Sequence, residues 1–231
     1  MTTLFVTSSG TDIGKTTVCC RLLEAVPSKM AVRCIKPVVT GFDPTAPDST
    51  DTAQLLEAQG LEIDATSIEA TSPWRFRAPL SADMAAKRQD SVISFDELVA
   101  FSQPPPGIEL NLIEGIGGVM APIDDQHTVL DWIGTLDAKV LLVVGSYLGS
   151  LSHTLTAVGA LSHRAQELFA IVISQSTTEP VPTIETAASL EHYCGGIPIT
   201  IMPRNETTSA AAGAALIEQW LRSDKKAAGY P

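Results

Sequence analysis

The chain has 231 residues, of which 45% are hydrophobic and 18% charged, and its formal net charge is −11. This composition supplies a sizeable core and argues against disorder, while the acidic balance argues against nonspecific binding to nucleic acid or to anionic membranes. The longest apolar run, residues 140–144, has the length of a strand and is far too short to span a bilayer.

The N-terminal residues predict a cytoplasmic protein. The chain enters an apolar strand at once, without the basic segment and long apolar stretch of an export signal. The cysteines, Cys19, Cys20, Cys34 and Cys194, show neither metal-ligand nor CxxC spacing. We interpret them as reduced thiols.

Strand-like and helix-like segments alternate along the whole chain. Strands are predicted at 4–7, 31–35, 110–113, 140–145, 169–174 and 198–202, and helices at 15–25, 52–59, 96–102, 129–136, 151–164, 184–193 and 209–222. Most of the strands are near-continuous Val/Ile/Leu runs, which is typical of strands buried on both faces. The sequence therefore predicts an α/β fold with a mainly parallel central sheet and helices on both faces. We expect a single domain over 1–222 and a frayed tail over 223–231.

A phosphate-binding loop is predicted directly after the first strand. The connecting segment is Ser8-Ser9-Gly10-Thr11-Asp12-Ile13-Gly14-Lys15-Thr16-Thr17. Loop amides and the positive end of the following helix would hold phosphates, with Lys15 at the terminal phosphates and the Thr16 hydroxyl on Mg²⁺. The first glycine of the usual pattern is missing, and the alternative is a plain strand-to-helix turn.

Polar residues also follow the second and third strands. In an open parallel sheet, ligands bind beyond the carboxyl ends of the strands. Lys36 and Thr40 follow strand 31–35, where Lys36 is either a cation facing the crevice or an ordinary solvated lysine. Glu114 ends the third strand and could hold Mg²⁺ directly or through water. Glycines after it would let backbone amides approach a phosphoryl group, and the alternative is a tight turn with Glu114 facing water.

Two further segments carry weaker signals. Asp51 stands just before helix 52–59, where it fits a helix N-cap and a metal ligand equally well. Residues 145–153 run from the fourth strand into a helix, and their serines and free amides predict an anion site, for instance for a carboxylate. Ser150 or Ser152 could equally be the N-cap of that helix.

Taken together, these segments resemble the dethiobiotin synthetase family, which has a P-loop NTPase-like fold. The resemblance rests on Gly14-Lys15-Thr16, Lys36-Pro37-Val38-Val39-Thr40-Gly41, Glu114-Gly115-Ile116-Gly117-Gly118 and the 143–149 segment, in this order and spacing. Asp131-Trp132 lies where the family often carries a similar pair. The resemblance runs from about Leu4 to Pro203, and the Lys-Pro-Val segment is its most discriminating part.

The resemblance implies an ATP-dependent ligase that makes the penultimate intermediate of biotin synthesis. Its substrates would be 7,8-diaminononanoate, CO₂ and Mg·ATP. One amine would capture CO₂ as a carbamate, ATP would phosphorylate that carbamate, and the second amine would close a cyclic urea and expel phosphate. Because these species are anionic, they require concentrated positive charge and amide donors. The intramolecular closure requires positioning but no covalent nucleophile.

The family also implies roles for individual residues. Lys36, Lys15 and Thr11 would be catalytic, and Thr16, Asp51 and Glu114 would hold the metal. The nucleotide would contact Asp12, Ile13, Gly14, Lys15, Thr16, Thr17, Asp51, Glu114, Gly115, Ile116, Gly117, Ser174, Gln175, Pro203, Arg204 and Asn205. The diamine or its carbamate would contact Thr11, Lys36, Thr40, Gly118, Ser150, Leu151 and Ser152. The family is a homodimer whose partner subunit helps to bind the substrate carboxylate, and we assign that task to 150–153.

Two departures from the family pattern affect the nucleotide site. Ser8 stands where the family usually has glycine, which predicts that the first turn of the loop is either tighter or differently hydrogen-bonded. Where the family commonly offers an asparagine to the base, this chain has Ser174 followed by Gln175. Gln175 carries the same amide on a longer arm and could contact an adenine edge.

Other functions fit the sequence less well. A partition or septum-positioning ATPase switch would place an extra lysine at the start of the loop, where this chain has Thr7-Ser8-Ser9-Gly10. An amidoligase of the cobyrinate-amidating kind would need a glutaminase domain, for which 231 residues leave no room. A binding-only module is weakened by the full set of metal and cationic groups.

Overall fold

The computed structural model describes residues 2–164 and 166–227, except for the side chains of 224–227. A six-stranded sheet with the order β2-β5-β1-β6-β7-β8 forms its centre. The strands are β1 (Thr2–Ser8), β2 (Val32–Ile35), β5 (Leu110–Glu114), β6 (Lys139–Gly145), β7 (Leu168–Ser174) and β8 (Ile199–Met202). Every neighbouring pair is parallel, as predicted.

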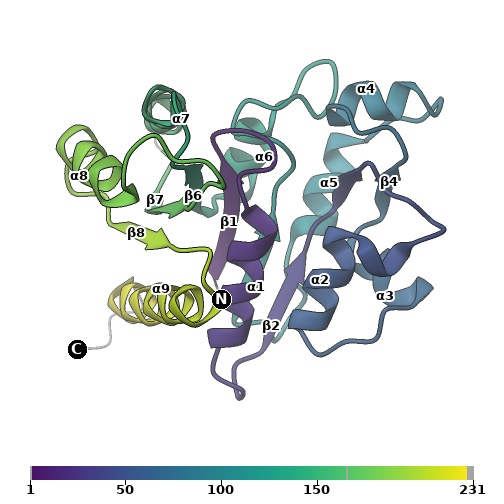
Figure 1. Ribbon diagram of the computed structural model, residues 1–231. Helices are drawn as coiled ribbons and strands as arrows, with labels where there is room; N and C mark the ends of the chain where they lie inside the picture. The colour runs from purple at the N-terminus through teal and green to yellow at the C-terminus, as the bar shows by residue number, and fades with distance from the viewer. Residues whose placement is uncertain (1, 165, 228–231) are drawn as a thin grey trace.

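Helices cover both faces of this sheet (Figure 1). One face carries α1 (Lys15–Ala25), α2 (Asp51–Ala58) and α9 (Glu206–Ala227). The other carries α5 (Phe95–Ser102), α6 (Val129–Leu136), α7 (Ser150–His163) and α8 (Thr183–Tyr193). The predicted α/β layering is therefore confirmed.

The central strand β1 shows why the strand sequences are nearly continuous runs of apolar residues. Leu4 and Val6 pack into the core beneath α1 and α9, whereas Phe5 points to the opposite core. There the Phe5 ring meets Trp132 of α6 edge-on, with ring centroids 4.8 Å apart. Since successive strand residues face opposite sides, a strand covered on both faces has no position for a solvated polar residue.

Several short elements were not predicted. A separate two-stranded parallel sheet pairs β3 (Val38–Thr40) with β4 (Trp74–Phe76). The helices α3 (Ala65–Thr71) and α4 (Ala82–Lys87) and the 3₁₀ turn η1 (Pro47–Ser49) also lie between β2 and β5. At the other end of the chain, α9 continues through Ala227, beyond Arg222 where we expected it to end. The remainder of the predicted tail, 228–231, lies outside the described residues.

The sheet order brings the predicted site segments together. β5 lies between β1 and β2, so the loops after these three parallel strands emerge side by side at one edge of the sheet. β6 lies on the other side of β1, and β7 follows it. Within the described residues, no helix has the length and apolarity needed to cross a membrane.

Candidate active site

The loop between β1 and α1 has the backbone of a phosphate-binding loop. Gly14 is the N-cap of α1 and has a left-handed conformation, with φ 97°. A Cβ atom there would also lie 2.5 Å from Ser174 Oγ at the end of β7. Glycine suits both conditions, because an L-residue is strained at this φ and the Ser174 hydroxyl would have to move aside for a Cβ atom. The loop amides and the positive end of α1 are thus free to face an anion.

Replacing Gly14 separates these two constraints. We expect Gly14→Ala to destabilise the protein by about 2–4 kcal/mol, adding steric overlap to the roughly 1 kcal/mol of left-handed strain. The control is Gly60→Ala, since Gly60 has φ 69° and nothing within 4 Å of its would-be Cβ. Urea unfolding of both variants measures the difference. Equal losses in the two variants would show that the contact with Ser174 carries no cost.

Ser8 gives the loop start a hydrogen-bonding role that glycine could not supply. Its buried Oγ lies 2.9 Å from Gly117 O and 2.5 Å from Gly10 O, either of which can accept its single proton. Lys15 Nζ donates to Ser8 Oγ over 3.2 Å and to Gly117 O over 3.0 Å. The prediction of a differently hydrogen-bonded loop start is therefore confirmed. Ser8 links the phosphate loop to the segment after β5 through the lysine.

Lys36 lies in a buried cluster of charges. Its side chain is 8% exposed, and Nζ donates to Glu114 Oε1 at 2.7 Å and to Asp51 Oδ2. Thr16 Oγ1 donates to the same Glu114 oxygen over 2.8 Å. Lys36 is therefore not a solvated strand-end lysine, and Glu114, at 1% exposure, does not face water. The N-cap of α2 is Thr50, which excludes that alternative role for Asp51.

The pKa values of the two lysines are shifted in opposite directions. Burial disfavours the charged form of both, but the carboxylates of Glu114 and Asp51 outweigh it at Lys36 and raise its pKa. At Lys15 burial dominates, assisted by the charge of Lys36, and the pKa lies below its usual value. Lys36 is therefore a permanent cation at neutral pH rather than a base.

The thiols near this site are inert. Burial raises the pKa of Cys19 and Cys34, and it raises the pKa of Cys20 to about 12. Because the thiolate is the reactive form, these cysteines are not nucleophiles at neutral pH.

The donor set of this cluster fits Mg²⁺. Thr16, Asp51 and Glu114 offer hard oxygen atoms, which this ion prefers, and Glu114 Oε2 is buried without a hydrogen-bond partner. No group of three or more His, Cys, Asp or Glu side chains suited to a metal occurs in the described part of the chain. Mg²⁺ commonly takes only one or two carboxylates, and phosphate oxygens and water complete its shell.

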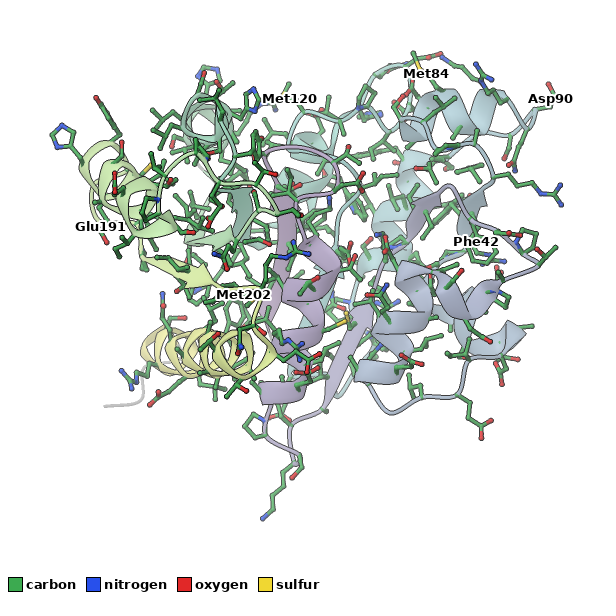
Figure 2. The ribbon with its side chains drawn as sticks, in the orientation of Figure 1. Phe42, Met84, Asp90, Met120, Glu191 and Met202 are labelled. Carbon is green, nitrogen blue, oxygen red and sulfur yellow. The ribbon has the colours of Figure 1, made fainter. Side chains whose placement is uncertain are left out.

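Two cavities flank the phosphate loop. The first, of about 440 Å³, lies toward β7 and β8, and the second, of about 370 Å³, lies toward β2 and β5. Both are lined by Asp12, Ile13, Gly14 and Thr17, so the loop forms their common wall. In Figure 2, Met202 of the first cavity lies to the left of α1, and Phe42, beyond the second, lies to the right.

Most of the predicted site residues line one of these cavities. Ser174, Gln175, Pro203 and Arg204 line the first. The second is lined by Thr11, Lys15, Thr16, Lys36, Thr40, Asp51, Glu114, Gly115, Ile116 and Gly117. The grouping thus separates the residues assigned to the base from those assigned to phosphate, metal and diamine.

The remaining predicted residues lie outside both linings. Asn205 Oδ1 accepts from Thr208 N at 3.3 Å, as a helix cap does at the start of α9. Gly118 packs against Ser8, where a Cβ would lie 3.1 Å from Ser8 O. Ser150, Leu151 and Ser152 form the first turn of α7, whose N-cap is Gly149 rather than a serine. Ser150 is buried, and the other two are exposed.

The structure adds lining residues that the sequence did not single out. Arg21, Tyr147, Ser176, Thr177, Thr178, Met202 and Ser209 line the first cavity, and Val39 and Gln54 line the second. Tyr147 lies within the 145–153 segment, and an aromatic residue in a loop after a strand could have indicated a cavity-lining residue. Arg21 lies on α1, and its place in the first cavity depends on the packing of α1 against α9.

Comparisons with known proteins agree with this geometry. A family model described as an AAA domain matches residues 2–212. An ATP-dependent dethiobiotin synthetase of Phenylobacterium zucineum is 41% identical over 210 residues, covering 89% of this chain and 90% of that protein. The chain belongs to the ATP-dependent dethiobiotin synthetase family. A second synthetase, from Methylobacterium nodulans, is 43% identical over 204 residues, covering 84% and 90% of the two chains.

Solved structures place this synthetase fold among P-loop ATPases. The MinC:MinD cell division complex of Aquifex aeolicus contains a chain that aligns with a TM-score of 0.53 and 11% identity, covering 96% of this chain and 95% of the other. At that identity the likeness concerns the fold alone. The two chains therefore share a fold.

Proposed function

We propose that this protein is an ATP-dependent ligase of biotin synthesis, which joins CO₂ to 7,8-diaminononanoate as a cyclic urea. Two independent observations support the proposal. The relatives at 41% and 43% identity are named ATP-dependent dethiobiotin synthetases. The structure also concentrates Lys15 and Lys36 beside a phosphate loop in an otherwise acidic protein.

The two cavities suggest how the substrates divide. The base and ribose of ATP enter the first cavity, beside Gln175, Pro203 and Arg204. The triphosphate crosses the loop at Gly14 and ends near Lys15 in the second cavity. The diamine occupies the same cavity beside Thr11 and Thr40, within reach of Lys36.

Mg²⁺ would be held by Thr16, Asp51 and Glu114, where it would neutralise phosphate charge. In the resting site, Lys36 Nζ contacts both of these carboxylates. With Mg²⁺ on these carboxylates, Lys36 would face the carbamate as a cationic donor. Lys15 would donate to the γ-phosphoryl group instead of to Ser8 and Gly117 O.

The proposed reaction has three steps. One amine nitrogen bonds to the carbon of CO₂ and loses a proton, which gives a carbamate. A carbamate oxygen bonds to the γ-phosphorus as its bond to the ADP oxygen breaks. The second amine nitrogen then bonds to the carbamate carbon, loses a proton and expels inorganic phosphate. Lys36 and Lys15 stabilise the negative charge in the second and third steps.

We also propose a homodimer in which the 150–153 segment of one subunit contacts the substrate carboxylate bound to the other. Support comes from the exposed apolar side chains of Leu148, just before this segment, and Leu151, within it, at 86% and 37% exposure. In a single subunit these apolar side chains are exposed to water, and contact with a second subunit would cover them. Light scattering in the presence of substrate tests this assignment, and a monomer would contradict it.

The observation that carries the proposed function is the buried contact of Lys36 with Glu114 beside the phosphate loop. The test is phosphate release from Mg·ATP with and without 7,8-diaminononanoate and bicarbonate. We expect release only when both are present, together with one dethiobiotin per phosphate. Release independent of the diamine would favour an ATPase switch and contradict the ligase.

A further inference from the structure

The loop after β7 fixes the side-chain amide of Gln175 from two sides. Gln175 Nε2 donates to Glu179 Oε2 at 2.8 Å. Gln175 Oε1 accepts the backbone N–H of Arg204 at 3.1 Å. Gln175 and Arg204 both line the first cavity. The side chain is therefore held between two loops at the mouth of the proposed base site.

These two partners permit only one orientation of the amide. An ionised carboxylate can only accept, and a backbone N–H can only donate. A flipped Gln175 would place its oxygen against the Glu179 carboxylate and its NH₂ against the Arg204 N–H, which loses both hydrogen bonds. Glu179 and the Arg204 N–H thus determine together which end of the Gln175 amide is the donor.

Glu179 is itself held by its surroundings. Its Oε1 accepts from Thr183 Oγ1 at the start of α8. Hydrogen bonds from Ser146, Thr183 and Gln175 lower the pKa of Glu179 and keep it ionised at neutral pH. At neutral pH the carboxylate therefore only accepts hydrogen bonds.

The fixed amide retains one free donor and one free acceptor. Its nitrogen has two N–H bonds and its oxygen two lone pairs, of which Glu179 and Arg204 use one each. This pair matches the edge of adenine, where a 6-amino group donates beside a ring nitrogen that accepts. A 6-oxo purine presents an acceptor at the same place and would face the Gln175 oxygen.

We propose that Glu179 is a positioning residue for nucleotide specificity, which orients Gln175 to select 6-amino purines over 6-oxo purines. The inference rests on the proposed function in that it takes the first cavity as the base site. Glu179 acts through Gln175, so its loss should relax the choice of base rather than abolish turnover.

The test compares ATP with inosine triphosphate, which differs at the 6-position and the adjoining N1–H. We expect the wild-type protein to favour ATP in kcat/KM by roughly ten- to a hundred-fold, the discrimination of one bidentate pair. Glu179→Gln keeps the shape but can donate as well as accept, so that only the Arg204 N–H still opposes a flipped Gln175 amide. The preference should then fall by roughly ten-fold. Glu179→Asp, which remains acceptor-only, should retain most of the preference.

Glu185→Gln is the matched control, because Glu185 is an exposed carboxylate in the first turn of α8. It removes the same charge and should keep the wild-type preference. General damage to the site would lower turnover with both nucleotides and leave their ratio unchanged. An unchanged ratio in Glu179→Gln would overturn the inference.

Calorimetric binding of ADP and IDP separates this inference from the proposed ligase function. If the ligase function is wrong, diamine-dependent turnover is absent, but the ADP to IDP affinity ratio still reports on Glu179. A lower ADP to IDP affinity ratio in Glu179→Gln supports the inference whether or not the diamine is a substrate. Equal ratios in wild type and variant contradict it.

Discussion

Lys36→Met is expected to abolish ring closure while nucleotide affinity stays within a few-fold of wild type. Loss of a cation beside a transferring phosphoryl group costs roughly 10³-fold or more in rate. Lys36 lines the second cavity, where we propose that the carbamate binds, and it does not line the cavity assigned to the base. Diamine-dependent phosphate release and ADP calorimetry measure the two effects separately.

Lys36→Met should also lower the free energy of unfolding. Removing one partner of a buried ion pair leaves Glu114, at 1% exposure, without its cation, which costs about 3–5 kcal/mol. Mg·ADP should restore part of this loss, because the metal supplies positive charge to the same carboxylates. The control is Lys87→Met, which breaks an ion pair with Asp125 between side chains 61% and 75% exposed and should change neither property. Wild-type turnover by Lys36→Met would contradict the role of Lys36.

Glu114→Gln should raise the Mg²⁺ concentration needed for half-maximal activity by roughly ten- to a hundred-fold, the range found when groups around a metal are altered. The Gln amide has nearly the shape of the carboxylate, but it lacks the charge that pairs with Lys36 and that we propose holds Mg²⁺. A magnesium titration at fixed ATP measures the shift.

Glu167→Gln is the control for Glu114→Gln. Glu167 also pairs with a lysine, Lys139, at 2.9 Å, but its side chain is 63% exposed and it lies outside both cavity linings. Its magnesium titration should match the wild type. If Glu114→Gln also titrates like the wild type, Glu114 does not hold the metal.

The sequence predicted the central sheet because its strands carry a strong local signal. A strand such as β6 is an unbroken apolar run, and such runs are typical of parallel sheets covered on both faces. For the residues that follow the strands, the sequence left two interpretations open, a functional one and a purely structural one. Lys36 could be recognised as buried only once β5 was known to lie between β2 and β1, which sets Glu114 beside it.

The missed elements and residues depend on contacts far along the chain. β3 is short, and its partner β4 lies more than 30 residues later, so neither shows a period of its own. Tyr147 and Arg21 look like ordinary loop and helix residues until the first cavity is assembled. Asn205 could be assigned to the base from family analogy, whereas in the structure its side chain contacts the first turn of α9.

The central claim is that the ATP-dependent step activates a carbamate in the cavity that holds Lys36. Turnover with C¹⁸O₂ in unlabelled water, quenched before bicarbonate exchanges its oxygen, tests this claim most directly. One carbamate oxygen attacks the γ-phosphorus and leaves with the phosphate. Mass spectrometry should therefore find one ¹⁸O in the released phosphate and one in the urea carbonyl of the product. Phosphate without ¹⁸O, formed alongside labelled product, would contradict the account.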